Sequence, residues 1–354
     1  MPKILNKKIG CFSDIHLGLG QDSKNWHNIA LDFAKWASEK YKELGIEEII
    51  IPGDIFHNRS EISVETLSVS REFFDYFKDF TVYISTGNHD CFKKDSSDIN
   101  SIKLLDGWNN IHIVDEDPLI LQTNYKKTIG LIPWGTPLDK FPKCDIMFAH
   151  LEINSFYMNS YKVCEHGFSH KDLFKTSPYI ISGHFHKRDH RKFDKGEILY
   201  LGSPYQHNFG DTNDDRGIYI FNIEENTFQF IENDISPKHI KYSVKALLEN
   251  PDQLTLESDK VDSLTRNNII SVIVDTKIDH EKLLSLQTKI ASMSPISLRI
   301  DHQEPDEKLS PNGNADDYQG EDLYKNIEEY INNLDIEHKK EVAEYVKELY
   351  NSLI

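Results

Sequence analysis

The sequence has no long hydrophobic run and only four cysteines, and both absences exclude classes of protein. No uninterrupted apolar stretch approaches the roughly 20 residues that a membrane-spanning helix needs. Lys3 to Lys8 leads directly into a strand-like run, without the apolar block of a signal peptide. We therefore expect a cytoplasmic protein that has no membrane partner.

Cys11, Cys91, Cys144 and Cys164 lack paired spacing, which favours free thiols over a disulfide framework or a thiolate zinc site. Basic residues are also few: the chain has 40 Lys and Arg and 58 Asp and Glu, which gives a net charge of -18. Sequence-independent DNA affinity comes mostly from basic side chains that neutralise phosphates. Strong DNA binding by this chain alone is therefore not expected.

Polar side chains with ligand chemistry are present at the ends of five strand-like runs. Asp14 and His16 are separated by one residue, and His184 and His186 repeat that spacing, so each pair can point to one face of a strand. Ligands gather beyond the carboxyl ends of strands in open α/β sheets, so the set predicts one site. Its members are Asp14, His16, Asp54, Asn88, His89, Asp90, His150, His184 and His186.

The ordered set is typical of a two-metal phosphoesterase site, although each motif taken singly is more often structural. Two divalent ions about 3.5–4 Å apart can activate water and clamp the oxygens of a phosphodiester. Mixed His, Asn and carboxylate ligands without thiolate favour Mn²⁺ first, with Mg²⁺ or Fe²⁺ as alternatives, and zinc also accepts His and carboxylate. We expect two such ions as cofactors.

The motifs resemble those of the calcineurin-like metallophosphoesterases and, within them, the SbcD-type double-strand-break repair nucleases, including the recombination endonuclease subunits of tailed phages. The most discriminating segment is Gly53-Asp54-Ile55-Phe56-His57, because these nucleases continue Gly-Asp with a hydrophobic pair and a histidine. Protein phosphatases of the superfamily carry Asp-Arg-Gly instead. Residues 200–205 (YLGSPY) and 215–221 (DRGIYIF) also resemble the nucleases, and the resemblance covers residues 8 to about 232.

The resemblance implies a ligand set for each ion. Asp54 would bridge the two ions, a position that suits its two oxygens and its negative charge. The first ion would be bound by Asp14, His16, Asp54 and His186. The second would be bound by Asp54, Asn88, His150 and His184.

The resemblance also implies three catalytic residues. His89 would face the scissile phosphate as an electrophile or proton donor. Asp90 would orient His89 through a hydrogen bond, as carboxylates do for catalytic imidazoles. His57 would contact the phosphate backbone or position His89, and the alternative for His57 is a structural histidine packed against the sheet.

The function implied is that of a DNA nuclease subunit, acting with an SbcC-type coiled-coil ATPase in end processing, recombination and repair. Metal-activated water would cleave DNA as a 3′-to-5′ exonuclease on duplex ends and as an endonuclease on single strands. The location would be the host cytoplasm if a phage encodes the chain. A homodimer within a heterotetramer is expected, with residues 63–77 a candidate contact. Two alternatives remain: a small-molecule or cyclic-nucleotide phosphodiesterase or phosphatase, and a metal-bearing scaffold without catalysis.

The expected fold is α/β, a calcineurin-like metallophosphoesterase β-sandwich flanked by helices, over residues 1–232. Apolar periodicity predicts helices at 28–44 and 64–77. Residues 152–177 look rich in loops that wall the cleft. Further strands are predicted at 111–114, 119–122, 128–133, 179–182, 198–201 and 217–223.

The chain continues with three further segments. Strands at 239–244, 269–274 and 296–300 with a helix at 280–292 predict a small α+β domain over 233–300, which by resemblance caps the nuclease and orients DNA. Residues 301–320 have the composition of a flexible acidic linker. Residues 321–354 predict two amphipathic helices. By resemblance these helices bind the ATPase, and the alternative is a helical hairpin packed on its own domain.

Overall fold

The computed structural model describes residues 3–4, 6–94, 96–159, 162–249, 265 and 267–302. The helical tail expected at 321–354, and the expected linker beyond His302, lie outside the described residues. Within the described ranges, no helix combines the length and the apolar character needed to cross a membrane.

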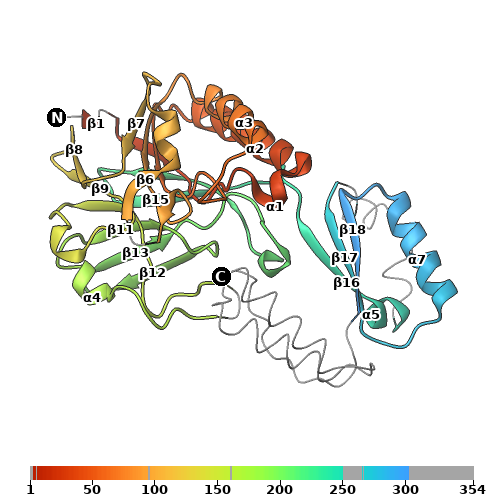
Figure 1. Cartoon of the computed structure of the whole chain (residues 1–354). Coiled ribbons are helices and arrows are strands. Elements are labelled where there is room, and N and C mark those ends of the chain that lie inside the picture. Colours follow the sequence, from red (N-terminus) through yellow and green to blue (C-terminus); the bar gives the residue numbers. More distant parts are fainter. Residues whose placement is uncertain are drawn as a thin grey trace, which may run out of the picture. The chain divides into compact units, whose positions relative to one another are not determined.

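Two mixed sheets form the centre of the larger part of the molecule (Figure 1). Among the described residues the first sheet has six strands, in the order β15 (Thr227–Glu232), β14 (Gly217–Asn222), β2 (Lys8–Cys11), β3 (Glu48–Pro52), β4 (Thr81–Ser85) and β7 (Ile111–Val114). The second has seven, in the order β1 (Lys3–Ile4), β8 (Leu119–Thr123), β9 (Thr128–Ile132), β10 (Ile146–His150), β11 (Tyr179–Gly183), β13 (Gly196–Tyr200) and β12 (Asp189–Phe193).

The central strands of each sheet run parallel. In the first sheet β2, β3, β4 and β7 are parallel neighbours, and in the second β9, β10, β11 and β13 are. The carboxyl ends of parallel neighbours meet at one edge of a sheet, so the turns after these strands collect there. The register pairs His150 with Gly183, which places the next residue, His184, close to His150.

Hydrophobic side chains fill the space between the sheets. Ile50 of β3 and Phe148 of β10 are fully buried in one cluster, although they come from different sheets. Burying a side chain of this size contributes about 1.5–3 kcal/mol. The inter-sheet core therefore fixes the two ligand-bearing edges relative to each other.

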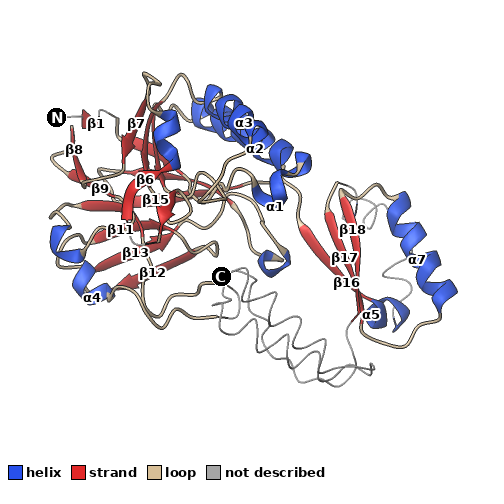
Figure 2. Ribbon diagram, viewed as in Figure 1, coloured by secondary structure: helices blue, strands red, loops and turns tan. Residues whose placement is uncertain are grey.

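Two long helices cover the outer face of the first sheet (Figure 2). α2 (Lys24–Glu43) ends before Gly45, whose φ of +67° and N–H bond to Lys42 form a left-handed cap. α3 (Val64–Asp75) begins after Ser63, whose hydroxyl accepts from the Thr66 N–H at 3.0 Å. Both predicted helices are therefore confirmed, with α2 starting a turn earlier than expected.

Short elements complete the larger part. The predicted loops at 152–177 contain one helical turn, and the charged strand β12 and the strand β15 were not predicted. The short elements are α1 (Leu19–Asp22), α4 (His170–Leu173), β5 (Cys91–Lys93), β6 (Ser96–Asn100), η1 (Ser101–Leu105), η2 (Leu138–Lys140) and η3 (Phe209–Asp211).

A three-stranded parallel sheet lies beyond residue 238 and consists of β16 (His239–Ser243), β17 (Ile269–Val274) and β18 (Ser297–His302). α5 (Val244–Glu249) and α7 (His280–Ser292) accompany it. Val244, Val272 and Ile290 are among the buried residues of its own core. The strands and the helix expected at 280–292 are found where the sequence pattern predicts them.

Candidate metal centre

The ends of five strands, and the turns that follow them, supply all seven predicted metal ligands. Because β2, β3 and β4 end at one edge of the first sheet and β10 and β11 at one edge of the second, the side chains converge where the two edges meet. These ligands are Asp14, His16, Asp54, Asn88, His150, His184 and His186.

Asp54 lies between the two predicted ligand groups. Its Oδ2 atom is 3.4 Å from His16 Nε2 and 3.3 Å from His150 Nε2, and the side chain is 1% exposed. One carboxylate that faces an imidazole on either side has the geometry expected of a bridging ligand.

The first group gathers around His16. Its Nε2 is 3.1 Å from His186 Nε2, and His186 Nε2 is 4.0 Å from Asp14 Oδ1. The buried Asp14 carboxylate also accepts from the His184 backbone N–H at 3.0 Å, which ties the two ligand segments together. Two nitrogens this close, beside two carboxylates, suit a shared cation.

The second group gathers around the Asn88 amide oxygen. His184 Nδ1 is 2.8 Å from Asn88 Oδ1, and His150 Nε2 is 3.0 Å from it. His150 Nδ1 donates to the Pro52 carbonyl at 2.8 Å, which turns Nε2 toward Asp54. Glu152 Oε1 is 3.3 Å from His184 Nε2 on the side away from Asn88, a carboxylate contact that commonly orients metal-binding histidines. Sequence reasoning missed Glu152.

Burial and neighbouring charges shift the pKa values of two of the predicted ligands, Asp54 and His16. Burial opposes the charge of Asp54, but His150 foremost, with His89 and His16, holds the pKa of Asp54 well below its usual value. Burial lowers the pKa of His16 well below the usual value for histidine. An ionised Asp54 beside a neutral His16 is the state in which this pair would bind a divalent cation.

The backbone at this centre is unusual. Asp14, His16, Asp54 and His184 all have positive φ, between 52° and 91°, a region that residues other than glycine rarely adopt. A Cβ on Gly87 would collide with Asp54, so the turn tolerates no side chain there. Such conformations cluster at functional sites, where surrounding structure enforces them.

His89 and His57 lie beside the first ligand group. His89 Nδ1 is 2.6 Å from the His57 carbonyl oxygen, which can only accept, so Nδ1 carries the hydrogen and Nε2 remains available. The two rings stack at 5.6 Å, and His57 Nδ1 is 3.3 Å from His16 Nδ1. His57 is therefore packed against the centre and half-buried, and both its proposed role of positioning His89 and its structural alternative remain predictions.

Asp90 differs from its expected role. Its two carboxylate oxygens accept backbone N–H bonds from Asp54, Ile55, Phe56 and Gly87, at 2.8–3.1 Å. No hydrogen bond joins Asp90 to His89 among the described residues, and the His57 carbonyl orients His89 instead. Burial, followed by the Asp54 charge, raises the pKa of Asp90 to about 7. Asp90 therefore holds the Asp54 turn to the Asn88 turn.

His207 is a further residue that sequence reasoning did not single out. Its ring nitrogen, with those of His16 and His186, forms a group whose ligand atoms all lie within 4.8 Å of one another. The only signal in the sequence was its place shortly after the YLGSPY segment.

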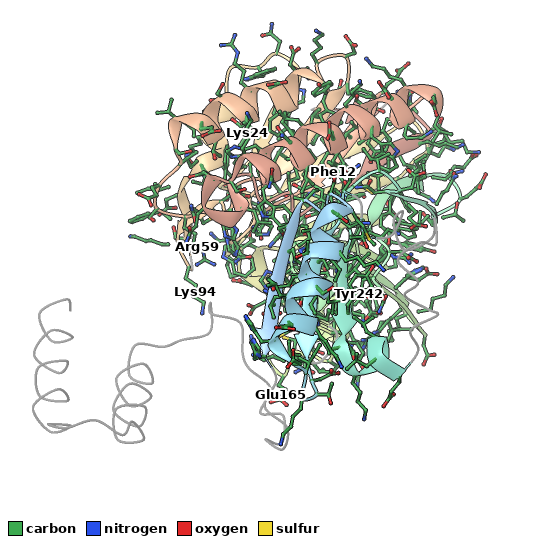
Figure 3. All side chains as sticks on the ribbon, turned by 90° about the vertical axis from the view of Figure 1, so that its right-hand side faces the viewer. Phe12, Lys24, Arg59, Lys94, Glu165 and Tyr242 are labelled. Atoms are coloured by element: carbon green, nitrogen blue, oxygen red, sulfur yellow. The ribbon has the colours of Figure 1, made fainter. Side chains whose placement is uncertain are left out.

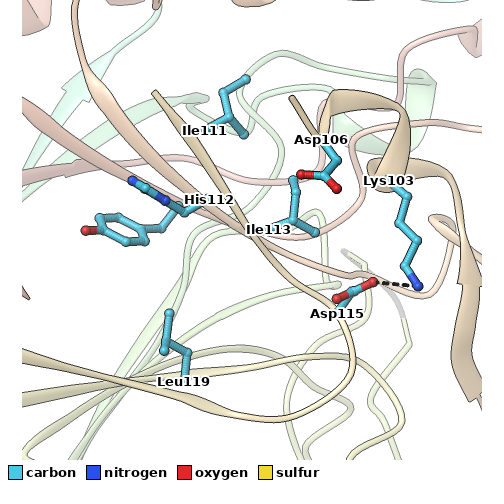
Figure 4. Close-up of a pocket in the computed structure, with 8 residues that line it drawn as sticks. Lys103, Asp106, Ile111, His112, Ile113, Asp115 and Leu119 are labelled. Atoms are coloured by element: carbon cyan, nitrogen blue, oxygen red, sulfur yellow. Dashed lines mark ion pairs between the residues drawn. The ribbon is translucent and has the colours of Figure 1, made fainter. Parts of the chain in front are cut away.

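Two of the cavities among the described residues differ in their relation to the centre. One of about 660 Å³ adjoins the second ligand group, since His150 and Glu152 line it together with Trp134, Phe168 and Lys94. The other, of about 380 Å³, lies at β7, where Lys103 pairs with Asp115 at 3.1 Å and His112 stacks on Tyr83 (Figure 4). None of the predicted site residues lines that second cavity.

Comparisons with known proteins identify the family of the chain. Residues 7–188 match the calcineurin-like phosphoesterase family. Exonuclease subunit 1 of Enterobacteria phage T4 is 29% identical, over 98% of this chain and 98% of its own length. The DNA double-strand break repair protein Mre11 of Methanocaldococcus jannaschii is 27% identical, over 60% of this chain and 62% of its own.

Among solved structures, an archaeal phosphodiesterase aligns over 64% of this chain and 99% of its own, with 16% identity and a TM-score of 0.37, a likeness too weak to refine the fold assignment. The family match spans more than half of the chain and includes all seven predicted ligands. The His and Asp clusters independently indicate a divalent metal site. The chain therefore belongs to the calcineurin-like phosphoesterase family of metal-dependent enzymes.

Proposed function

We propose that this protein is a Mn²⁺-dependent DNA nuclease subunit that processes DNA ends in recombination and repair. It would act as a 3′-to-5′ exonuclease on duplex ends and as an endonuclease on single strands. The main support for this proposal is that both predicted ligand groups converge on Asp54. Its Oδ2 atom lies 3.4 Å from His16 Nε2 in one group and 3.3 Å from His150 Nε2 in the other. The similarity to the phage exonuclease subunit over 98% of both chains supports DNA as the substrate.

The residues present fit two ions, with Asp14, His16, Asp54 and His186 as one ligand set and Asp54, Asn88, His150 and His184 as the other. Bound ions would supply water activation and neutralisation of the phosphoryl oxygens. His89 would then contribute its Nε2, since Nδ1 is held by the His57 carbonyl. A protonated Nε2 can donate to a phosphate oxygen or to the leaving alkoxide.

The cavity beside the second ligand group favours a substrate that carries a nucleobase. The ring centroid of Trp134 lies 5.3 Å from that of His184. Trp134 Nε1 donates to the Lys94 carbonyl at 2.7 Å, and this hydrogen bond fixes the indole at the cavity wall. Stacking of a base on an aromatic side chain contributes about 1–3 kcal/mol. Lys94 and Arg59 project from one margin of the view in Figure 3, where they could contact phosphates despite the acidic chain.

Two kinds of partner belong to this proposal. An SbcC-type coiled-coil ATPase would bind residues 321–354, and a second copy of this chain would pair through the surface of α3. Val64 and Leu67 of that helix are 84% and 37% exposed, although both are apolar. This exposure supports a protein contact there.

The test compares cleavage of end-labelled duplex and single-stranded DNA with hydrolysis of bis-p-nitrophenyl phosphate and a phosphomonoester, all with Mn²⁺. His89→Gln is expected to retain Mn²⁺ and lose cleavage by about 10²–10⁴-fold, the usual contribution of a general acid. Asp54→Asn is expected to weaken the binding of both ions. His112→Gln is the matched control, because His112 is an exposed histidine at the other cavity.

Loss of DNA cleavage in His89→Gln with retained metal, while His112→Gln cleaves normally, supports the proposal. Hydrolysis of the small diester or monoester with DNA left intact, even with an ATPase partner added, indicates a small-molecule phosphodiesterase or phosphatase instead. Metal binding without hydrolysis of any of these substrates indicates a scaffold. Equal metal loss in His89→Gln and Asp54→Asn contradicts the role given to His89.

A further inference from the structure

The buried imidazole of His207 has no hydrogen-bond partner at either nitrogen among the described residues. The residue is only 7% exposed. Burying a polar group without a partner costs free energy, and buried imidazoles are normally satisfied by protein, water or a metal. His207 therefore needs an explanation that the seven predicted ligands do not provide.

The position of His207 points to the first ligand group. Its ring centroid lies 4.8 Å from that of His186 and 5.2 Å from that of His16. The ligand nitrogens of all three histidines lie within 4.8 Å of one another, which one cation can span. An unpartnered nitrogen of His207 therefore lies close to His16 and His186, both of which are predicted to bind the first ion.

The surroundings hold His207 in this place. Its backbone N–H donates to Asp211 Oδ2 at 2.9 Å, and Asp211 Oδ1 pairs with the buried Arg216 at 2.9 Å. The imidazole packs edge-on against Tyr205 and Trp26, at 5.3 and 6.4 Å between ring centroids. A ring fixed by packing and by a buried ion pair behind its backbone is organised in advance for a ligand.

We propose that His207 is a further ligand of the first ion, beside Asp14, His16, Asp54 and His186, which rests on the two-metal site proposed above. A third imidazole gives this ion a nitrogen-rich site, whereas the second ion keeps the Asn88 oxygen. Imidazole suits iron, cobalt, nickel and zinc better than Mg²⁺, so His207 biases the first site toward nitrogen-preferring divalent ions.

The experiment titrates the metal-free full-length protein with Co²⁺ and with Mg²⁺, without DNA, by calorimetry and by the visible absorption of bound Co²⁺. His207→Phe keeps an aromatic ring for packing but removes both nitrogens. His239→Phe is the matched control: His239 is also buried, packs on Trp26 and has an orphaned Nδ1, but belongs to none of the candidate metal clusters among the described residues. Metal-free unfolding temperatures show that each variant is folded.

His207→Phe is expected to weaken one of two Co²⁺ binding events by on the order of 10-fold or more, with a changed absorption spectrum and a smaller loss of Mg²⁺ affinity. His239→Phe is expected to leave both events and the spectrum unchanged. Unchanged Co²⁺ affinity and spectrum in His207→Phe overturn the proposal, as does an equal loss for Co²⁺ and Mg²⁺. Fewer than two Co²⁺ ions on the unaltered protein would instead refute the two-metal site itself.

Discussion

Glu152 contacts His184, a member of the second ligand group. Its carboxylate contacts His184 Nε2 at 3.3 Å while His184 Nδ1 faces Asn88 Oδ1, so one ring is held from both sides. The contact with His184, foremost among the causes, lowers the pKa of Glu152 below its usual value. A charged carboxylate at Nε2 fixes the tautomer of His184 and raises the basicity of Nδ1, the nitrogen predicted to bind the metal.

Glu152→Gln is expected to lower the Mn²⁺ affinity of the second site by about 10- to 100-fold and to leave the first site unchanged, because the amide cannot replace the carboxylate behind His184. Calorimetric Mn²⁺ titration measures both affinities. Glu165→Gln is the control, since it removes the same charge from an exposed position of the same segment. Indistinguishable titrations for the two variants would refute a role for Glu152.

At the residue scale, the sequence predicts site residues at the ends of strands and misses those that loops contribute. The seven predicted ligands could be singled out because each lies at or just after the end of a recognisable apolar run. Glu152 and His207 could not, since their place depends on how irregular segments fold back onto the sheets. Asp90 was found but its contacts were not, because its hydrogen bonds to residues 54–56 join segments more than 30 residues apart.

At the scale of elements, periodicity predicts segments with one clearly buried face. α3 has such a pattern, with Phe73 on its buried face, whereas β17 is recognised as a continuous apolar run that is buried on both faces and includes Val272. β12 has the sequence DHRKF without a buried face, and its pairing with β13 arises only in the folded sheet. β15 alternates with Phe228 and Phe230 on one side, a signal that was present and overlooked.

The exposed apolar surface of α3 gives a prediction at this scale. Leu67→Lys is expected to convert a dimer into a monomer, because a charge buried without a partner at an interface is costly. Light scattering after size-exclusion chromatography measures the mass. Leu284→Lys is the control, since Leu284 is an exposed leucine of α7, 53% accessible. A dimer that persists in Leu67→Lys, or an unaltered protein that is already monomeric, would contradict the assignment.

The net charge of -18 bears on the whole molecule. Attraction of DNA phosphates requires local positive charge, and bound divalent ions would supply it at the centre. Away from the centre the chain would repel the polyanion. A nuclease subunit with this charge is therefore expected to depend on a partner for much of its affinity for DNA, which gives the C-terminal segment its proposed importance.

The C-terminal segment lies outside the described residues, so its prediction rests on the sequence alone. Ile327 belongs to the apolar stripe of the first helix expected in residues 321–354, whereas Asn332 would lie on the opposite side of the same helix. Apolar stripes are the anchors of helix-in-groove docking. Ile327→Lys is therefore expected to weaken co-purification with an SbcC-type ATPase, whereas Asn332→Lys adds the same charge and leaves binding intact. Hydrolysis of bis-p-nitrophenyl phosphate should be unchanged in both variants, because the metal ligands are untouched. Equal ATPase binding by the two variants would favour a tail packed on its own domain, and the acidic chain would then need another source of DNA affinity.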